Sequence, residues 1–555
     1  MNDICKSRPP ELLGASLGVS LAEAQARLTA PGAPFETHVR LIRGVATTVW
    51  THVPATAAQA FARARAFGPR EFLVYQDSRV TYDGFARAVA AVANHLVARG
   101  VMTGDRVAVA MKNQPEWPVA FLGALLAGAI AVPLNAWWTA DELAYALSDS
   151  GARLVFVDPE RCARLAGLPI TLLDVNAIAG EAAQWGDLPD APLPPVALDP
   201  EDDATLFYTS GTSGLPKGAL GTHRALTTNI FAAPFVQVRN ELRRGQARDG
   251  DRQKVTLLAV PFFHVIGSLS ILLPNMAAGG KLVLMPRFEA AAALDLIARE
   301  RVSVAGGVPA IALSLLEHAP GHDLSSLELV SFGGAPCSAA LAARIKDELG
   351  AWPGQGWGMT ETSATCTSHS AEDYLAHPES CGPALPVCRL KVMRDGVAAP
   401  PGAIGELWAF GPNIVKGYWN RPDDTAAVFR DGWIKTGDLA SLDEDGFLTI
   451  HDRAHDMVIR GGENIYCIEV ENILGQHPAV ADAALVGLPH PLLGEVPAAL
   501  VQARGPVSQE ALRAFAAQRL AAFKVPVEVM ISTAPLPRNA GGKLIKRDVR
   551  KVFGA

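Results

Sequence analysis

The chain has 555 residues, of which 49% are hydrophobic and 19% are charged, and its formal net charge is −7 at pH 7. This length exceeds what one hydrophobic core usually organises, so we expect at least two domains. The sequence has 49 Lys and Arg against 56 Asp and Glu and no dense basic block, which argues against nucleic acid as a partner.

The beginning of the sequence and the cysteines indicate the cellular setting. Residues 1–10 lack the apolar core of a secretory signal. The seven cysteines are odd in number and form no C-x-x-C pair, a pattern typical of reduced thiols rather than disulfides or a zinc site. We therefore expect a cytoplasmic protein.

Hydrophobic periodicity predicts alternating helices and strands. After Thr81, apolar residues recur at helical spacing as far as Leu96, and Gly100 is placed to end that helix. Apolar runs predict buried strands at Arg106–Met111, Ala129–Val132, Arg153–Val157, Val255–Val260 and Lys281–Met285. Strands that alternate with helices are typical of βαβ units. The predicted fold class is α/β, with mostly parallel sheets flanked by helices.

The segment Pro118–Leu134 is uncharged and apolar, and it is the one stretch that resembles a membrane span. It falls short of the ~20 residues needed to cross a bilayer. We predict a buried helix that runs into a buried strand, and no transmembrane segment. Peripheral contact with a membrane stays open as an alternative if the substrate is a long acyl chain.

The loop after the apolar run Ala204–Phe207 is the most informative part of the chain, with the sequence YTSGTSGLPKG over residues 208–218. Backbone N–H groups exposed by glycines, together with hydroxyls and an ammonium, suit a polyphosphate. The P-loop signature is absent, because Lys217 is followed by Gly218 instead of Ser or Thr. The predicted phosphate-loop residues are Thr209, Ser210, Gly211, Thr212, Ser213, Gly214 and Lys217. A mobile Gly/Ser turn is the alternative explanation.

Four later segments add to this loop: SFGGAP at 331–336, GQGWGMTE at 354–361, KTGD at 435–438 and PRNAGGK at 537–543. Glycines on both sides of the flat aromatic Trp357 suit a purine. The Thr360–Glu361 pair offers a hydroxyl and a carboxylate to phosphate and Mg²⁺, since hard cations prefer oxygen ligands. A tryptophan packed in a core beside a surface glutamate would explain these residues singly but not their spacing.

In this order, the segments resemble the signature motifs of the adenylate-forming superfamily, which includes acyl-CoA synthetases, firefly luciferase and the adenylation domains of nonribosomal peptide synthetases. The resemblance runs from Tyr208 to Lys543 and covers nearly the whole chain. It implies a large N-terminal adenylation domain, residues 1–451, that binds ATP and the acyl group. A small, mobile α+β C-terminal domain, residues 452–555, would carry the catalytic lysine.

The resemblance also implies roles for single residues. Lys543 would bridge the attacking carboxylate and the α-phosphate, Glu361 would hold Mg²⁺, and Asp438 and Arg453 would bind the ribose. Trp357 stands where the family usually has Tyr, so stacking area is kept while the phenol hydroxyl is lost. Besides the phosphate loop, the expected ATP- and AMP-binding residues are Gly334, Ala335, Pro336, Gln355, Gly356, Trp357, Gly358, Met359, Thr360, Asp438, Arg453 and Lys543.

The implied chemistry begins with attack of a carboxylic acid on the α-phosphorus of ATP, which gives acyl-AMP and pyrophosphate. A carboxylate is ionised at pH 7, so no general base is required. The expected catalytic residues are Thr209, His264, Glu361 and Lys543. The acyl pocket is expected near His264, Val265, Gly334 and Met359. A histidine there would orient the carboxylate or gate thiol entry, although a hydrogen-bonded core histidine is about as common.

Several features bear on the identity of the substrate and on the second step of the family's reaction, in which the acyl group passes to the CoA thiol. The apolar surroundings of His264, with no acidic partner for an α-amine, favour a fatty or aryl-type acid. Gly461 and Gly462 resemble the loop that lines the family's pantetheine tunnel for coenzyme A, although a hairpin turn explains their spacing equally well. The hinge position, usually Asp or Lys in the family, is His455. Because histidine titrates near neutral pH, we expect the balance between domain orientations to depend on pH.

The leading hypothesis is an ATP-dependent carboxylic acid:CoA ligase whose partners are a small-molecule acid, ATP with Mg²⁺, and CoA. One alternative is an acyl-AMP ligase that loads a carrier protein. Because the chain ends at Ala555, soon after the lysine loop, we expect no fused carrier domain. A luciferase-like monooxygenase or a non-catalytic nucleotide or acyl sensor are further alternatives, and a sensor would not need both Lys543 and Glu361. Whether the chain forms a homodimer stays open.

Overall fold

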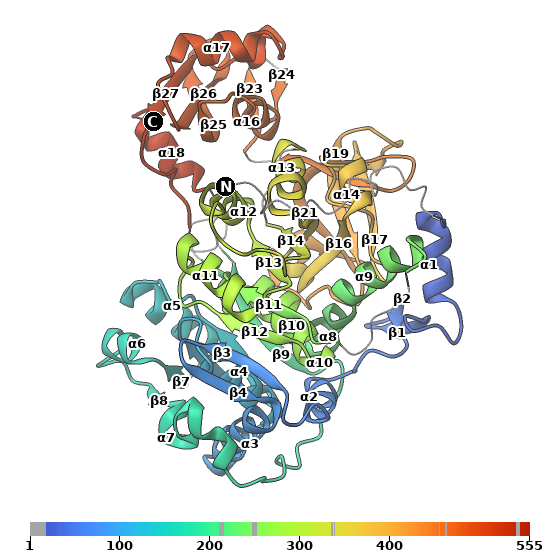
Figure 1. The fold of residues 1–555 in the computed structure, drawn as a ribbon, viewed down its shortest axis with the longest axis vertical. Coiled ribbons are helices and arrows are strands. Elements are labelled where there is room, and N and C mark those ends of the chain that lie inside the picture. The colour runs from blue at the N-terminus through green and yellow to red at the C-terminus, as the bar shows by residue number, and fades with distance from the viewer. Residues whose placement is uncertain are drawn as a thin grey trace, which may run out of the picture.

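The computed structural model describes residues 18–209, 216–246, 252–334, 337, 339–453, 456–460, 463–539 and 544–554. Figure 1 shows a large body built from the N-terminal four-fifths of the chain, with a smaller C-terminal unit at the top. Eleven of the predicted site residues lie outside the described residues: Ser210, Gly211, Thr212, Ser213, Gly214, Ala335, Pro336, His455, Gly461, Gly462 and Lys543.

The first large sheet has six strands and is parallel apart from one edge pair. In spatial order its strands are β10 (Lys217–Thr222), β9 (Asp203–Thr209), β6 (Ile130–Pro133), β5 (Arg106–Ala110), β7 (Leu154–Val157) and β8 (Thr171–Leu173). Only β9 and β10 run antiparallel, as a hairpin whose connection is the predicted phosphate loop.

The second large sheet has eight strands, with antiparallel pairs at both edges and parallel strands between them. Its order is β16 (Ala364–Ser370), β15 (Trp352–Met359), β14 (Leu329–Phe332), β13 (Val304–Gly307), β11 (Val255–Leu258), β12 (Lys281–Leu284), β3 (Glu71–Tyr75) and β4 (Ser78–Thr81). Together the two sheets confirm the predicted α/β class.

One hydrophobic core joins the two sheets through the helices between them, including α2 (Ala57–Arg65), α3 (Tyr82–Ala98), α4 (Glu116–Leu126) and α10 (Leu273–Ala278). The predicted helix after Thr81 is α3, whose periodic apolar residues are fully buried. The apolar segment Pro118–Leu134 forms α4 and β6, a buried helix followed by a buried strand as predicted. Among the described helices, none combines the length and apolar character required to cross a bilayer.

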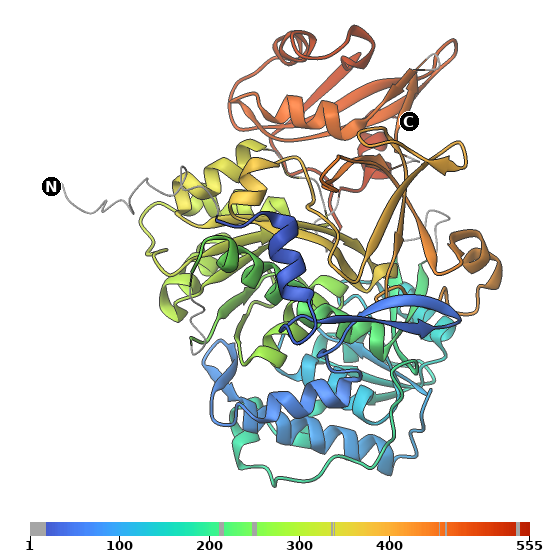
Figure 2. The same ribbon diagram turned by 90° about the vertical axis from the view of Figure 1, so that its right-hand side faces the viewer.

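Further helices pack around these sheets (Figures 1 and 2). They are α5 (Ala140–Ser150), α6 (Pro159–Arg164), α7 (Val175–Ala179), α8 (His223–Thr228), α9 (Ala232–Arg243), α11 (Ala290–Glu300), α12 (Pro309–His318), α13 (Ala339–Leu349) and α14 (Glu372–Ala376). At the N-terminal side, α1 (Leu21–Thr29) packs on α9, and β1 (Thr37–Ile42) pairs with β2 (Val45–Trp50) as a separate hairpin.

A third sheet, which the sequence did not predict, is wholly antiparallel and follows the second. Its strands are β17 (Arg389–Arg394), β18 (Val397–Ala398), β19 (Gly405–Phe410), β20 (Phe429–Arg430), β21 (Trp433–Leu442) and β22 (Leu448–Arg453). The helix α15 (Pro422–Val428) lies between β19 and β20 in the chain. The inner face of β21 carries Thr436 and Asp438 between Ile434 and Ala440, so its sequence lacks the apolar alternation of an ordinary strand.

The C-terminal unit begins after β22 and forms its own sheet, with strands β23 (Val458–Arg460), β24 (Glu463–Ile465), β25 (Val480–His490), β26 (Gly494–Ala503) and β27 (Glu528–Ser532). Its helices are α16 (Cys467–Gly475), α17 (Gln509–Ala517) and α18 (Lys546–Val552). These elements fit the expected small α+β unit. An ion pair of 3.3 Å between Arg504 Nη2 and Glu317 Oε1 joins this unit to α12. The boundary at residue 452 stays a prediction.

Candidate active site

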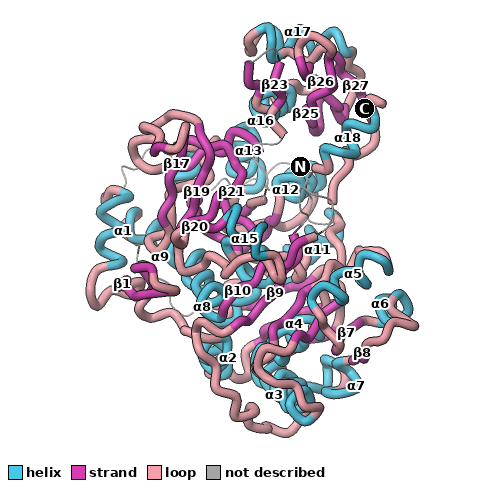
Figure 3. Tube along the Cα trace, turned by 180° about the vertical axis from the view of Figure 1, so that it is seen from behind, coloured by secondary structure: helices cyan, strands magenta, loops and turns pink. Residues whose placement is uncertain are grey.

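The hairpin of β9 and β10 fixes both ends of the predicted phosphate loop. Thr209 and Lys217 are direct partners in this antiparallel ladder, and Thr209 Oγ1 donates to the Lys217 carbonyl over 3.5 Å. The Lys217 ammonium lies 2.9 Å from Oδ1 of Asp424 in α15 and 5.4 Å from the centre of the Tyr418 ring. Figure 3 shows α15 beside β9 and β10. Lys217 is therefore held at the base of the loop by an anion and an aromatic ring.

Glu361 is buried directly after β15, where a 3-10 turn, Thr360–Thr362, begins. Its Oε1 accepts a hydrogen bond of 2.8 Å from the Tyr418 hydroxyl. Burial raises the pKa of the Glu361 carboxyl, while the Tyr418 hydrogen bond and the charge of Arg453 act in the opposite direction. The Tyr418 hydrogen bond and the Arg453 charge offset only part of the cost of burying this carboxylate. Such a carboxylate is suited to bind a cation or a phosphate-bound metal ion.

Tyr418 was not singled out from the sequence, although it connects two predicted residues. An antiparallel bridge to Ala219 of β10 and a hydrogen bond from Val415 N to the Glu361 carbonyl (3.0 Å) place its segment against the site. Asn413, also missed, is fully buried and donates to the carbonyls of Thr362 (2.9 Å) and Thr365 (3.1 Å), which fixes the turn after Glu361. Neither residue belongs to a run that indicates phosphate or metal chemistry, so the sequence held no signal for them.

The glycines of β15 are required by the fold. An added Cβ at Gly358 would lie 1.5 Å from the Ala364 carbonyl oxygen, and one at Gly356 would lie 2.6 Å from that of Thr367. The ladder between β15 and β16 shifts its register between Trp357 and Gly358. The backbones therefore approach each other too closely for a side chain, whether or not a purine binds beside them.

Trp357, Asp438 and Arg453 form one hydrogen-bonded group across two sheets. The indole Nε1 of Trp357 donates to Asp438 Oδ2 over 2.9 Å, and Arg453 Nε lies 2.7 Å from Asp438 Oδ1. Asp438 and Arg453 are direct partners in the ladder of β21 and β22. The Trp357 ring belongs to a hydrophobic cluster and is only 9% exposed, so it is more deeply packed than an open purine slot suggests. The two carboxylate oxygens retain lone pairs for further donors such as a diol.

The other residues predicted on β15 differ in their surroundings. Gln355 is buried, and its Oε1 accepts a hydrogen bond of 2.7 Å from the Tyr374 hydroxyl, so its side chain is committed to the core. The Met359 backbone N donates to Thr362 Oγ1 over 2.9 Å. Met359 and Thr360 are half-buried at the end of the strand, where they lead into the Glu361 turn.

His264 lies in a turn before a π-helical segment, Ile266–Leu272. Its carbonyl accepts from Ser268 N (3.1 Å) and Ser268 Oγ (3.0 Å), which fixes its backbone. Its Nε2 is buried and makes no hydrogen bond within the described part of the chain. Burial lowers the pKa of His264 to about 4, so the ring is neutral at pH 7. A buried polar atom without a partner is costly, and a polar substrate group would satisfy it.

Two contacts relate this turn to the other predicted acyl-pocket residues. Gly334 has φ +76° at the end of the segment after β14, and an added Cβ there would lie 3.5 Å from Ile266 Cδ1. Val265 is buried beside His264. The structure thus brings Gly334 to the His264 turn, while Met359 lies on β15, the neighbour of β14.

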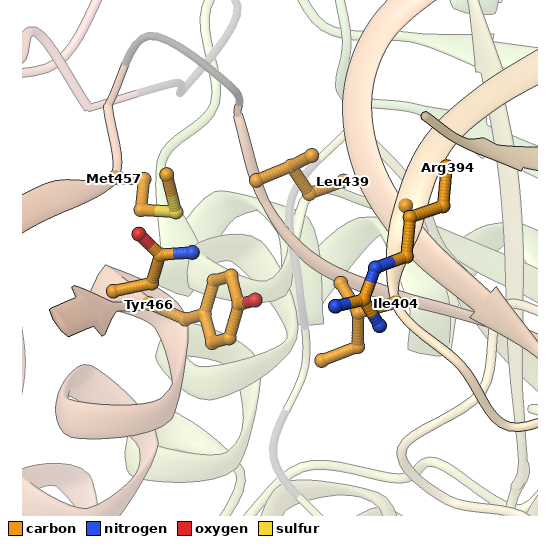
Figure 4. Close-up of a pocket in the computed structure, with 7 residues that line it drawn as sticks. Arg394, Ile404, Leu439, Met457 and Tyr466 are labelled. Carbon is orange, nitrogen blue, oxygen red and sulfur yellow. The ribbon is translucent and has the colours of Figure 1, made fainter. Parts of the chain in front are cut away.

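A pocket of about 380 Å³ lies between the third sheet and the C-terminal unit. Figure 4 shows Arg394, Ile404 and Leu439 on one side and Met457 and Tyr466 on the other. In the chain, Met457 precedes and Tyr466 follows residues 461–462, the predicted CoA-tunnel glycines. The pocket is therefore formed where the two units meet, and Met457 in its lining is two positions after the predicted hinge residue in the chain.

Comparison with known proteins agrees with this geometry. Residues 60–419 match the family model described as AMP-binding enzyme, and residues 469–543 match the AMP-binding enzyme C-terminal domain. A feruloyl-CoA synthase from Amycolatopsis is 38% identical over 491 residues, which cover 86% of this chain and 94% of that protein. An o-succinylbenzoate CoA synthetase from Bacillus subtilis, solved with its acyl-adenylate intermediate, aligns with a TM-score of 0.75 and 32% identity over 88% of this chain and 97% of that one. Its complex with ATP and a magnesium ion aligns with a TM-score of 0.76 and 32% identity, over 88% and 99% of the two chains.

Proposed function

The chain belongs to the AMP-binding enzyme family of adenylate-forming enzymes, and from this premise we propose that it is an ATP-dependent ligase that joins an aryl carboxylic acid to CoA. The observation that carries the proposal is the connected group around Glu361. A buried carboxylate, the Tyr418 hydroxyl and the Lys217 ammonium lie together at the base of the phosphate loop, close enough to Asp438 and Arg453 for their charges to act on Glu361.

In the first step, an oxygen of the substrate carboxylate attacks the α-phosphorus of ATP. The new O–P bond forms as the bond to pyrophosphate breaks, which yields acyl-AMP. The proposed work of the protein is alignment and charge neutralisation. Thr209 and Lys217 would hold the departing phosphates, Asp438 and Arg453 would bind the ribose, and Lys543 would neutralise charge between the carboxylate and the α-phosphate.

The residues present fit a magnesium ion that arrives with ATP. Within the described ranges, no group of three or more His, Cys, Asp and Glu side chains could hold a metal by itself. Mg²⁺ is commonly bound by one or two carboxylates together with substrate phosphates. Glu361 is the proposed protein ligand, and the ion would supply further neutralisation of phosphate charge.

The proposed acid is aromatic. The relatives named above are called feruloyl-CoA synthase and o-succinylbenzoate CoA synthetase, and both names refer to an acid that contains a benzene ring. Phe262, Phe263 and Val265 beside His264 are buried, and its unpartnered Nε2 leaves one polar atom for a substrate group. A flat, apolar acid with one polar substituent matches this combination better than an amino acid does.

In the second step, the CoA thiol attacks the acyl carbon and AMP leaves. We assign this step to a rotated position of the C-terminal domain, residues 452–555, with His455 as the hinge and Gly461 and Gly462 along the thiol path. The meeting of the two units at the pocket of Figure 4 supports this assignment. A carrier-protein thiol is the alternative acceptor. We further propose a cytoplasmic location, where ATP and CoA are available.

The test is pyrophosphate release with ATP and Mg²⁺ against a panel of aryl, fatty and amino acids, with and without CoA. We expect aryl acids to give sustained turnover only when CoA is added. A single burst that is indifferent to CoA would favour a carrier-loading ligase, and no release with any acid would contradict the enzyme. Lys543→Ala should slow adenylation on the order of 10²-fold or more, because one charge pair at about 4 Å contributes roughly 4 kcal/mol at an effective dielectric near 20.

A further inference from the structure

A charged side chain is buried three residues after Lys543 in the chain. Lys546 is the first residue of α18, and its Nζ lies 3.0 Å from Oε1 of Glu471 in α16. The two side chains are 13% and 15% exposed. Burial lowers the pKa of the Lys546 ammonium, but the charges of Glu471 and Asp452 outweigh this effect and hold it above its ordinary value. Removing one partner of a buried pair is strongly unfavourable, so this contact fixes the start of α18.

The Glu471 carboxylate is itself held in one orientation. Its Oε1 also accepts a hydrogen bond of 2.8 Å from the backbone N of Leu485 in β25. The ion pair therefore joins α18 to two other elements of the C-terminal unit, α16 and β25.

A second ion pair holds the other end of the segment that contains Lys543. Arg538 Nη2 lies 2.6 Å from Asp482 Oδ2 in β25. An antiparallel bridge pairs Arg538 with Leu544, and Ile545 N donates to the Pro537 carbonyl over 2.9 Å. Both ends of this segment are thus paired with each other and tied to the C-terminal unit by ion pairs, Arg538 to β25 and Lys546 to α16.

The same helix, α16, is fastened to the strand that leads into the hinge. The backbone N of Cys467, the first residue of α16, donates to Asp452 Oδ2 over 2.6 Å, and Cys467 Sγ donates to the Asp456 carbonyl over 3.1 Å. Helix α16 therefore contacts residues on both sides of the hinge position, Asp452 and Asp456. It also contacts Lys546, which follows the segment that contains Lys543.

We infer that Lys546 is a positioning residue for catalysis: its ion pair with Glu471 sets the location of the segment that carries Lys543 and couples it to the hinge through α16. The inference rests on the proposed function, because it assumes that Lys543 acts on the α-phosphate. ATP and the acid would be bound mainly by residues of the large body. Loss of the ion pair should therefore lower the rate of adenylation more than the affinity for either substrate.

The experiment compares wild type, Lys546→Ala, Lys546→Arg and Glu471→Gln in pyrophosphate release over a range of ATP and acid concentrations. Lys551→Ala is the matched control, since Lys551 lies on the same helix, is 65% exposed and pairs with Asp548. We expect kcat to fall tenfold or more in Lys546→Ala, with KM for ATP and acid within about threefold of wild type. Lys546→Arg should recover most of the rate, and Lys551→Ala should match wild type.

The outcomes separate this inference from the proposed function. An inactive wild type would contradict the proposed function itself. An active wild type with kcat within twofold in both Lys546→Ala and Glu471→Gln would overturn the positioning role. So would a loss that appears only in KM. If Lys546→Ala does not fold, Glu471→Gln still decides, because glutamine keeps an acceptor for Leu485 N while it removes the charge.

Discussion

The indole Nε1 of Trp357 donates a hydrogen bond of 2.9 Å to Asp438, although 81 positions separate the two residues in the chain. Asp438 also forms an ion pair with Arg453 of the neighbouring strand. The residue predicted to stack on the purine and the residue predicted to bind the ribose are therefore coupled. A tryptophan at this position does more than preserve the stacking area of a tyrosine, because its N–H fixes the carboxylate that is predicted to bind the ribose.

Trp357→Phe should weaken AMP binding about tenfold. Phenylalanine keeps an aromatic ring but removes a hydrogen bond to a charged group, and such bonds contribute about 1.5–3 kcal/mol. Calorimetric titration with AMP measures the effect, and binding of the acid serves as the internal control. Equal AMP affinity in wild type and variant would contradict the role of the indole N–H.

Tyr418→Phe should raise the Mg²⁺ concentration needed for half-maximal activity several-fold. The Tyr418 hydroxyl fixes one oxygen of Glu361, and without it the carboxylate is free to turn away from the phosphates. Magnesium titrations at constant ATP and pH test this, together with Mg²⁺-dependent binding of a non-hydrolysable ATP analogue. Tyr75→Phe, which alters a tyrosine on β3 away from the site, is the control. An unchanged magnesium requirement would show that Tyr418 does not orient Glu361.

The His264 imidazole should stay neutral over the whole pH range in which the enzyme would be assayed. Its folded-state pKa of about 4 lies below the ordinary value near 6.5, so the ring gains no proton between pH 5.5 and 8. The ratio of kcat/KM between wild type and His264→Gln should therefore be constant over this range. A step in that ratio near pH 6.5 would mean that the imidazole is solvated and titrates normally.

Asp452 should make the folded protein less stable as the pH rises from about 4 to 6. Burial raises its folded-state pKa to about 6, while the unfolded chain releases the proton near 3.9. Between these values the folded state binds more protons, so the free energy of unfolding falls with increasing pH. Asp452→Asn should flatten thermal stability over this interval, whereas Asp445→Asn, at an exposed turn, should not. Parallel curves for wild type and Asp452→Asn would disprove the shift.

His455→Lys should flatten the pH profile of thioester formation. Histidine changes its charge near neutral pH and lysine does not, so only the wild-type hinge would alter the domain balance between pH 6 and 8. Single-turnover transfer from preformed acyl-AMP to CoA isolates this step from adenylation. Identical pH profiles in wild type and His455→Lys would show that His455 does not cause the pH dependence of thioester formation.

The large body was predictable because its elements carry clear periodicity. The apolar residues of α3 recur at helical spacing, and the segment that forms α4 and β6 is uniformly apolar, so both elements follow from pattern alone. The third sheet could not be found in this way. Its strand β21 buries Thr436 and Asp438 on the inner face, and these buried polar residues interrupt the alternation of apolar and polar residues by which a strand is recognised.

The site residues divide in a similar manner. Thr209, Lys217, Glu361, Asp438 and Arg453 were accessible from motifs, and the structure brings their elements together. Tyr418, Asp424 and Asn413 were not, because their contacts are with residues far away in the chain and none of the three lies in a chemically suggestive run. Local sequence thus predicts groups for substrate contact, but it does not indicate the residues that hold those groups in place.

The ion pair between Arg504 and Glu317 has a consequence for motion between the two units. Both side chains are more than one third exposed, at 37% and 38%, and exposed pairs contribute only about 0–1 kcal/mol. Water and salt replace such a contact almost without loss. This contact therefore presents almost no barrier to turning of the C-terminal unit, and screening it with added salt should change the rate of that turning only slightly.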